Sequence, residues 1–324
     1  MTTPAAQPPE GIDTVPAGDD ACANCNAVLV GEYCAACGQR RFRDSDRRLG
    51  HLLGEAFEQL TDLDGRFLRS LRGLMLRPGR IARDWFDGRK ARWMSPLTLF
   101  LFANVLFFFA PGLTDLTLGL SMQVPEPVLR EFRTPAQNEA NRVLGGQFHS
   151  PVTAPLAQRA LARAREAADA AGRQFDLDRF AIEYHARSDA IGKALVIVHV
   201  PLVALALMLT AWRSRRYFAE HMLLALTLVA FTLLFIQLVL MPTAWVYLWA
   251  MNHLGPGGTQ SMPTFARLGL VGINVGYFAF ACRRCYDSGW LLAVVQGFLA
   301  FVALAFGNLV VYRGLQLLIT LWTM

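Results

Sequence analysis

Long apolar segments are the feature that most constrains how this chain folds. A transmembrane helix needs about 20 consecutive, mostly apolar residues, and the stretch 95–113 contains no charged residue. Four further stretches of similar character follow it, at 194–212, 222–251, 264–282 and 290–312. With 54% hydrophobic and 17% charged residues, the composition also lies outside the range usual for soluble domains. We therefore expect an all-α integral membrane protein with about five transmembrane helices.

The polar regions between these stretches divide the chain. Residues 1–20 are rich in Pro, Ala, Gly and Asp, a composition typical of a disordered tail. Residues 40–94 are basic and carry leucines and phenylalanines at helical spacing, which predicts amphipathic helices at the membrane interface or packed on the membrane helices. The helical membrane domain then occupies 95–324, with an insertion at 114–193. Residues 314–324 are too few to span a membrane alone, so they either continue the last span or lie along the interface.

The distribution of basic residues predicts the orientation. Lys and Arg in short loops stay on the cytoplasmic side of a membrane. Residues 38–94 contain 14 Lys and Arg against 8 acidic residues, three arginines lie within 213–216, and two more lie at 283–284. With five spans, all three basic segments fall on one side. We therefore expect a multi-pass membrane protein, with a cytoplasmic N-terminus and with the insertion 114–193 outside.

The basic segment ahead of the first apolar stretch also indicates a partner. The whole chain has a formal net charge of +6, and an excess of this kind beside a span suits anionic lipid headgroups better than nucleic acid. We expect these side chains to face lipid phosphates: Arg66, Arg69, Arg72, Arg80, Arg89 and Lys90.

Four cysteines near the N-terminus are spaced like metal ligands. They form two CxxC pairs separated by eight residues, and they are Cys22, Cys25, Cys34 and Cys37. A structural zinc ion takes four tetrahedral thiolates, often from two such turns. Asn26 and Gly38, which follow the two pairs, both tolerate the left-handed backbone that these turns use. The pattern predicts a structural zinc ribbon at 21–39, with iron or an unmetallated dithiol as the open alternatives, and it leaves no coordination position for catalysis.

Polar side chains in or beside the apolar stretches are further candidates. His199 lies within the second stretch, where either a functional role or an interhelical hydrogen bond accounts for it. Glu220 and His221 stand where the third stretch begins. A carboxylate next to an imidazole can bind a metal or move protons, or it can pair with the nearby arginines and anchor the helix. The remaining pair, Cys282 and Cys285, is redox-active, metal-binding or incidental, and no residue is assigned a catalytic role.

Several short motifs together resemble a bacterial family known as domain of unknown function 3667. They are Cys22–Gly38 followed by Gln39, Leu76-Arg77-Pro78-Gly79, Gly88-Arg89-Lys90, Ser95-Pro96-Leu97 and Tyr217-Phe218-Ala219-Glu220-His221. The resemblance covers roughly half of the chain and implies an inner-membrane protein with an N-terminal zinc ribbon. It implies no reaction.

The leading functional hypothesis is a non-enzymatic membrane protein whose zinc ribbon docks a cytoplasmic protein. The first alternative is a transporter or channel for a small solute or ion, which gains support if His199, Gln237 and Asn274 line one cavity. The second is an enzyme acting on lipid headgroups, which requires Glu220 and His221 to be open at the headgroup level.

Overall fold

The computed structural model describes residues 21–41, 65–109, 119–133, 147–254 and 264–324. In these ranges the backbone is mostly helical and forms no β-strand, only two isolated antiparallel bridges close to the N-terminus. The predicted all-α class is therefore confirmed. The predicted disordered tail at 1–20 lies outside the described residues, as does 42–64 of the basic region.

Two short helices precede the first apolar stretch. They are α2 (Gly65–Leu76) and α3 (Arg80–Phe86), and the turn between them is Arg77-Pro78-Gly79. One face of α2 packs against the hydrophobic core through Phe67, Leu71 and Leu74. Proline lacks the backbone N–H that a helix interior needs, and Gly79 adopts a left-handed φ of 70°, so the chain breaks at this point.

The membrane body is assembled from six α-helices. They are α4 (Pro96–Phe109), α10 (His199–Thr210), α11 (Phe218–Phe235), α12 (Met241–Leu254), α13 (Thr264–Tyr286) and α14 (Trp290–Phe306). Helix α11 packs against α4 and α10, and α14 packs against α10 and α13. Nearly every residue of α11 is buried, so this helix is the centre of the body.

Three continuous helical segments are long and apolar enough to cross a membrane: Leu177–Thr210, Phe218–Tyr247 and Trp290–Thr323. They contain the fifth predicted span and include most of the second and third. The first predicted span is the shorter helix α4, and residues 110–113 at its end are not described. The fourth corresponds to α13, which is not among the three. Within the described residues the structure thus supports a helical membrane protein with three candidate spans, and the count of five stays a prediction.

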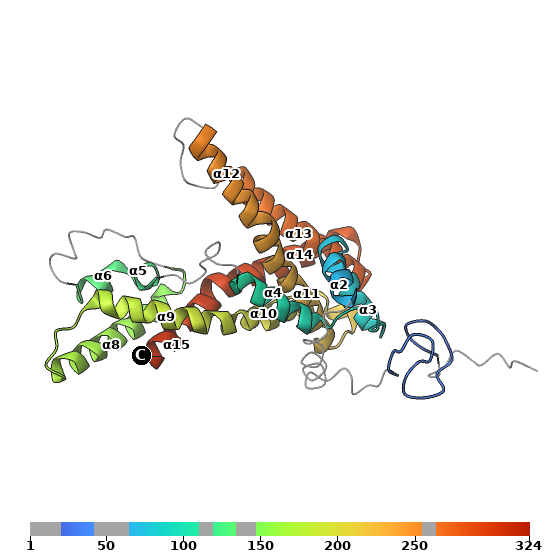
Figure 1. Ribbon diagram of the computed structural model, residues 1–324, viewed down its shortest axis with the longest axis horizontal. Helices are drawn as coiled ribbons and strands as arrows, with labels where there is room; N and C mark the ends of the chain where they lie inside the picture. The colour runs from blue at the N-terminus through green and yellow to red at the C-terminus, as the bar shows by residue number, and fades with distance from the viewer. Residues whose placement is uncertain (1–20, 42–64, 110–118, 134–146, 255–263) are drawn as a thin grey trace, which may run out of the picture.

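A second cluster of buried side chains lies at one end of the molecule, where Figure 1 shows α5, α6, α8 and the C-terminus. We call it the distal cluster; it contains Leu120, Val124, Leu129, Phe132, Ala157, Leu161, Leu177, Tyr184, Leu317 and Leu321. Its helices are α5 (Leu120–Gln123), α6 (Glu126–Arg130), α8 (Ser150–Ala170), α9 (Leu177–Leu195) and α15 (Arg313–Thr323). Helix α15 continues the last span and packs against α8 and α9, which answers the question left open for 314–324.

The long apolar helices are not regular along their length. A 3₁₀ turn, η2 (Val196–Val198), joins α9 to α10, and another, η3 (Trp212–Ser214), follows α10. Two π-helical turns occur: η4 (Ile236–Leu240) between α11 and α12, and η5 (Gly307–Tyr312) between α14 and α15. Pro242 lies just after η4. Since its ring clashes with a carbonyl one turn earlier, the wider π turn gives the helix room to continue.

Candidate metal centre and its attachment to the body

The two CxxC turns of the N-terminal segment have the same backbone geometry. The N–H of Cys22 donates to the carbonyl of Ala27, and the N–H of Cys34 donates to the carbonyl of Gln39, each at 2.8 Å. Asn26 and Gly38 have φ angles of 59° and 72°, which is the left-handed conformation expected after each pair. These repeated turns bring the sulfurs of both pairs to one point.

The four cysteine sulfurs lie within 4.8 Å of one another. The Sγ atoms of Cys22 and Cys37 are 3.6 Å apart, and those of Cys25 and Cys34 are 3.5 Å apart. A tetrahedral Zn–S₄ site with bonds near 2.3 Å places its sulfurs about 3.8 Å apart, so this donor set fits a structural metal ion. The cluster supports a metal site and does not identify the metal.

The thiols in this cluster compete for ionisation. Burial opposes the thiolate of Cys37, but hydrogen bonds from the Asn24 side chain and the Gln39 backbone outweigh it and lower its pKa to about 6. The backbone N–H of Ala27 favours the thiolate of Cys25, yet the neighbouring sulfurs raise the pKa of that thiol to about 12. Adjacent thiolates repel one another, and a bound cation would remove that repulsion.

Gln39, directly after the second turn, attaches this segment to the body. Its side-chain amide donates from Nε2 to the carbonyl of Gly88 at 2.5 Å, and its Oε1 accepts from the N–H groups of Lys90 and Ala91 at 3.0 and 3.1 Å. Gln39 is 6% exposed. One buried side chain therefore fixes the metal centre to the loop that follows α3.

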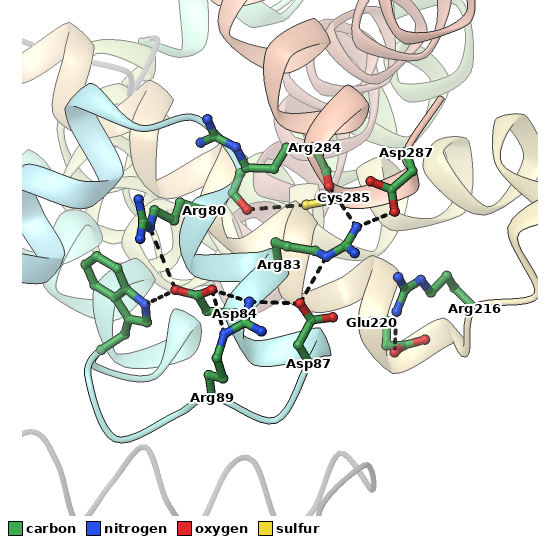
Figure 2. A network of polar contacts seen from close by, with 12 residues as sticks. Arg80, Arg83, Asp84, Asp87, Arg89, Arg216, Glu220, Arg284, Cys285 and Asp287 are labelled. Carbon is green, nitrogen blue, oxygen red and sulfur yellow. Dashed lines mark hydrogen bonds and ion pairs between the residues drawn. The ribbon is translucent and has the colours of Figure 1, made fainter. Parts of the chain in front are cut away.

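That loop is held in turn by a carboxylate. Asp84 accepts a hydrogen bond from Nη2 of Arg89 at 2.6 Å (Figure 2). It also accepts one from the indole Nε1 of Trp93 at 2.7 Å. Asp84 is 8% exposed, and the hydrogen bond from Arg89 to Asp84 raises the pKa of the guanidinium. Arg89 lies inside the turn that receives Gln39, and Trp93 lies just after it, so Asp84 holds this turn at two points.

Helix α3 is also clamped to the end of α13. Arg83 donates to the Asp87 carboxylate at 3.1 Å, to the carbonyl of Arg284 at 3.0 Å and to the Asp287 carboxylate at 2.5 Å (Figure 2). Arg284 donates to the carbonyl of Pro78 at 2.6 Å. The contacts with Arg284 and Asp287 thus join residues 78–83 to a segment about 200 positions later in the chain.

The Arg-Pro-Gly turn lies directly on the α13 backbone. A Cβ placed on Gly79 would be 2.7 Å from both the Cα and the carbonyl oxygen of Ala281. The thiol of Cys285 donates to the carbonyl of Gly79 at 3.4 Å, and the hydroxyl of Tyr277 donates to the carbonyl of Leu74. Cys282 and Cys285 are both fully buried, so their surroundings are those of packing residues.

The six basic residues expected at lipid phosphates differ in their surroundings. Arg80 and Arg89 pair with Asp84, and the Lys90 ammonium lies 4.9 Å from the centre of the Trp85 ring. Arg66 is partly buried. Arg69 and Arg72 are exposed on α2. A role at the lipid surface thus rests mainly on α2 and stays a prediction.

The membrane-helix candidates are each engaged by protein groups. The Glu220 carboxylate accepts from the backbone N–H of Tyr217 at 2.8 Å, in a capping box, and pairs with Arg216 at 3.3 Å. His221 Nδ1 lies 2.7 Å from the hydroxyl of Tyr286. Glu220 and His221 are 7% and 1% exposed. This geometry supplies the partners that the anchoring interpretation requires.

His199 does not share a cavity with Gln237 or Asn274. Its Nδ1 lies 2.9 Å from the carbonyl of Val196, whereas the amide oxygen of Asn274 accepts from Thr232. His199 lines a cavity, but Gln237 and Asn274 do not line it. The three residues thus fail to form the single polar cavity on which the transporter interpretation depends.

Sequence reasoning did not identify the attachment roles of Gln39, Arg83 and Asp84. For Gln39 a signal existed, because it was one of the motif residues behind the family resemblance. For the other two, the spacing of Arg80 with Asp84 and of Arg83 with Asp87, each four residues apart, offered a helical ion-pair pattern. The link to Asp287 carried no local signal.

No curated protein matches this chain. No solved structure matches it either. A family model does match: residues 64–108 align with the family described as "Protein of unknown function (DUF3667)". This segment contains α2, α3, the loop that receives Gln39 and most of α4. The match confirms the resemblance for this segment, and the four-cysteine cluster fits the N-terminal, zinc-ribbon-like site that the resemblance implies.

Proposed function

We propose that this protein is a non-enzymatic docking protein of the bacterial inner membrane. Its N-terminus and zinc ribbon lie in the cytoplasm, five helices span the membrane, and the ribbon presents a surface for a cytoplasmic protein. The observation that carries the proposal is the three-bond attachment of Gln39 to the loop 88–91. A module fixed in one orientation at the membrane surface can position a partner there.

The outer surface of the ribbon supports a protein partner. Val28, Val30 and Tyr33 are 58%, 96% and 64% exposed, and no Lys or Arg occurs between positions 21 and 39. Exposed apolar side chains of this kind suit a protein interface better than a nucleic acid, whose phosphates require basic residues.

The exposed face of α2 suits the membrane surface. Leu68 and Leu76 are 68% and 67% exposed, and Arg69 and Arg72 are exposed beside them. Leucines that enter the headgroup region next to arginines that meet phosphates are typical of an interfacial helix on anionic lipid. This contact would hold the docking platform against the bilayer.

A crosslinking experiment in intact cells tests the docking function. A photoreactive residue at Val30 should yield a discrete adduct with a cytoplasmic protein, and the adduct should disappear in Cys34→Ser, because that change removes a metal ligand. The same probe at Val152, which is 73% exposed on α8, is the matched control. Absence of a discrete adduct at Val30, or the same adduct from both positions, would contradict the proposal.

A second experiment tests the attachment itself. In Gln39→Ala the N–H of Ala91 loses its acceptor, and the N–H of Lys90 keeps only the carbonyl of Gly88 at 3.1 Å. The hydrogen exchange of both groups should therefore accelerate while bound metal is unchanged. Gln174→Ala removes a side-chain amide at an exposed position between α8 and α9, and it serves as the control. Unchanged exchange at 90 and 91 would show that the ribbon is not held by this side chain.

A further inference from the structure

The membrane body contains an apolar cavity that has no role in the proposed docking function. Its volume is about 330 Å³, within the range of small-molecule sites, and its walls come from α4, α10, α11 and α14 with their flanking turns. Phe107 and Phe301 contribute aromatic surface, and most of the other lining residues are aliphatic. Among the described residues, no charged side chain lines this cavity.

Two polar groups on its wall have no hydrogen-bond partner among the described residues. The hydroxyl of Tyr312 is buried without a hydrogen bond, although Tyr312 is only 1% exposed. In the described part of the chain, no hydrogen bond joins the Asn308 side chain to another residue. A buried hydroxyl without a partner in an apolar interior is costly, so a ligand that accepts from Tyr312 would remove that cost.

His199 stands next to Tyr312, with the two ring centres 5.4 Å apart. Because a carbonyl only accepts, the contact with Val196 makes Nδ1 the donor and leaves Nε2 as an acceptor in the neutral ring. Gly307 permits this placement, since a Cβ there would lie 3.4 Å from the imidazole and 3.0 Å from Leu202. The wall therefore offers a donor at Tyr312, an acceptor at His199 and both functions at Asn308.

Irregular helix geometry is concentrated at the same place. Val196 belongs to η2, Ile236 to η4, and Asn308 and Tyr312 to η5, and all four residues line the cavity. Each irregular turn gives up regular α-helical hydrogen bonding, and π turns occur frequently at functional sites. Three such turns around one cavity indicate a built site and not a packing defect.

We propose that this cavity binds a neutral lipid-soluble molecule with a flat, oxygen-substituted ring on an apolar chain, the chemistry of an isoprenoid quinone or quinol. The aromatic side chains suit the flat ring, the three polar groups suit its carbonyl or hydroxyl oxygens, and the aliphatic wall suits the chain. A phospholipid headgroup is a poorer match because its phosphate would find no cation on the wall.

Calorimetric titration of the purified full-length protein in micelles tests this site, with protein-free micelles as the blank. Decylubiquinone should bind saturably at one site per chain. Tyr312→Phe should weaken binding about five- to tenfold, the effect of losing one hydrogen bond. Tyr184→Phe makes the same change at a buried tyrosine of the distal cluster and should leave the affinity unchanged.

Two further arms keep the outcome decisive. Ala305→Phe should fill the cavity and abolish binding, and its thermal unfolding without ligand reports whether it folds. Dioctanoylglycerol offers hydroxyl and carbonyl groups but no ring, and it should not bind. Nonsaturable partition of the quinone, equal effects of the two tyrosine variants, or tighter binding of the glycerolipid would each overturn the proposal.

Discussion

Replacing Gly79 by alanine tests the joint between the juxtamembrane helices and the membrane body. Two separate costs arise at this position. A non-glycine residue at a φ of 70° is strained, and the added Cβ would lie 2.7 Å from two backbone atoms of Ala281. Since these are main-chain atoms of α13, no flexible side chain can move aside, and α3 and α13 must separate.

The magnitude follows from adding these two costs. The left-handed conformation costs an L-residue about 1–2 kcal/mol, and overpacking of a close contact costs about 1–3 kcal/mol. Gly79→Ala should therefore lower the free energy of unfolding by about 2–5 kcal/mol. Gly172→Ala is a matched control: its φ is +66°, and a Cβ there meets no atom within 4 Å. The control should lose only the strain, about 1–2 kcal/mol.

Reversible unfolding in mixed detergent micelles measures both variants, and hydrogen exchange around each site detects local opening of either region. In Gly79→Ala the amides of α3 and of the 284–287 segment should lose protection together, because Arg83 and Arg284 bridge them. If the two variants lost equal stability, to within about 0.5 kcal/mol, the close contact with Ala281 would carry no energetic weight and the reasoning would be refuted.

Three other predictions concern the metal, the topology and the capping carboxylate. Metal analysis should find one zinc ion per chain, sharply reduced in Cys34→Ser and retained in Cys282→Ser; full zinc in the first variant would exclude the site. A membrane-impermeant thiol reagent applied to intact cells should label a cysteine placed at Val152, but label one at Trp212 only after permeabilisation, and the reverse pattern would invert the topology. Glu220→Gln should destabilise the protein by about 1 kcal/mol without loss of docking at normal abundance. Loss of docking there would instead favour direct action by this carboxylate.

Local sequence rules predicted the parts of this fold that depend on local chemistry. The left-handed residues after each CxxC pair, the break at Arg-Pro-Gly and the apolar helices all follow from residues within a few positions of one another. Contacts over long sequence separations were not predictable in this way. Gln39 meets Gly88 across 49 positions, and Arg83 meets Asp287 across 204.

The basic segment shows why counting charges does not predict the environment of each basic side chain. From the sequence, all six basic side chains selected between 66 and 90 had the same expected environment. In the structure, Arg80 and Arg89 share the carboxylate of Asp84, whereas Arg69 and Arg72 face outward from α2. A buried carboxylate draws nearby guanidinium groups to itself because pairing offsets its desolvation. Only the fold reveals which carboxylate is buried.

The three CxxC pairs have identical spacing but different environments in the fold. In the first two, Asn26 and Gly38 turn the backbone into the left-handed region directly after the second cysteine, and the sulfurs converge. After Cys285 the helix α13 continues through Tyr286. Residues three apart on a helix lie on one face, so both thiols of this pair are buried in packing contacts. The residue that follows the motif, not the motif, decides between a metal ligand and a core residue.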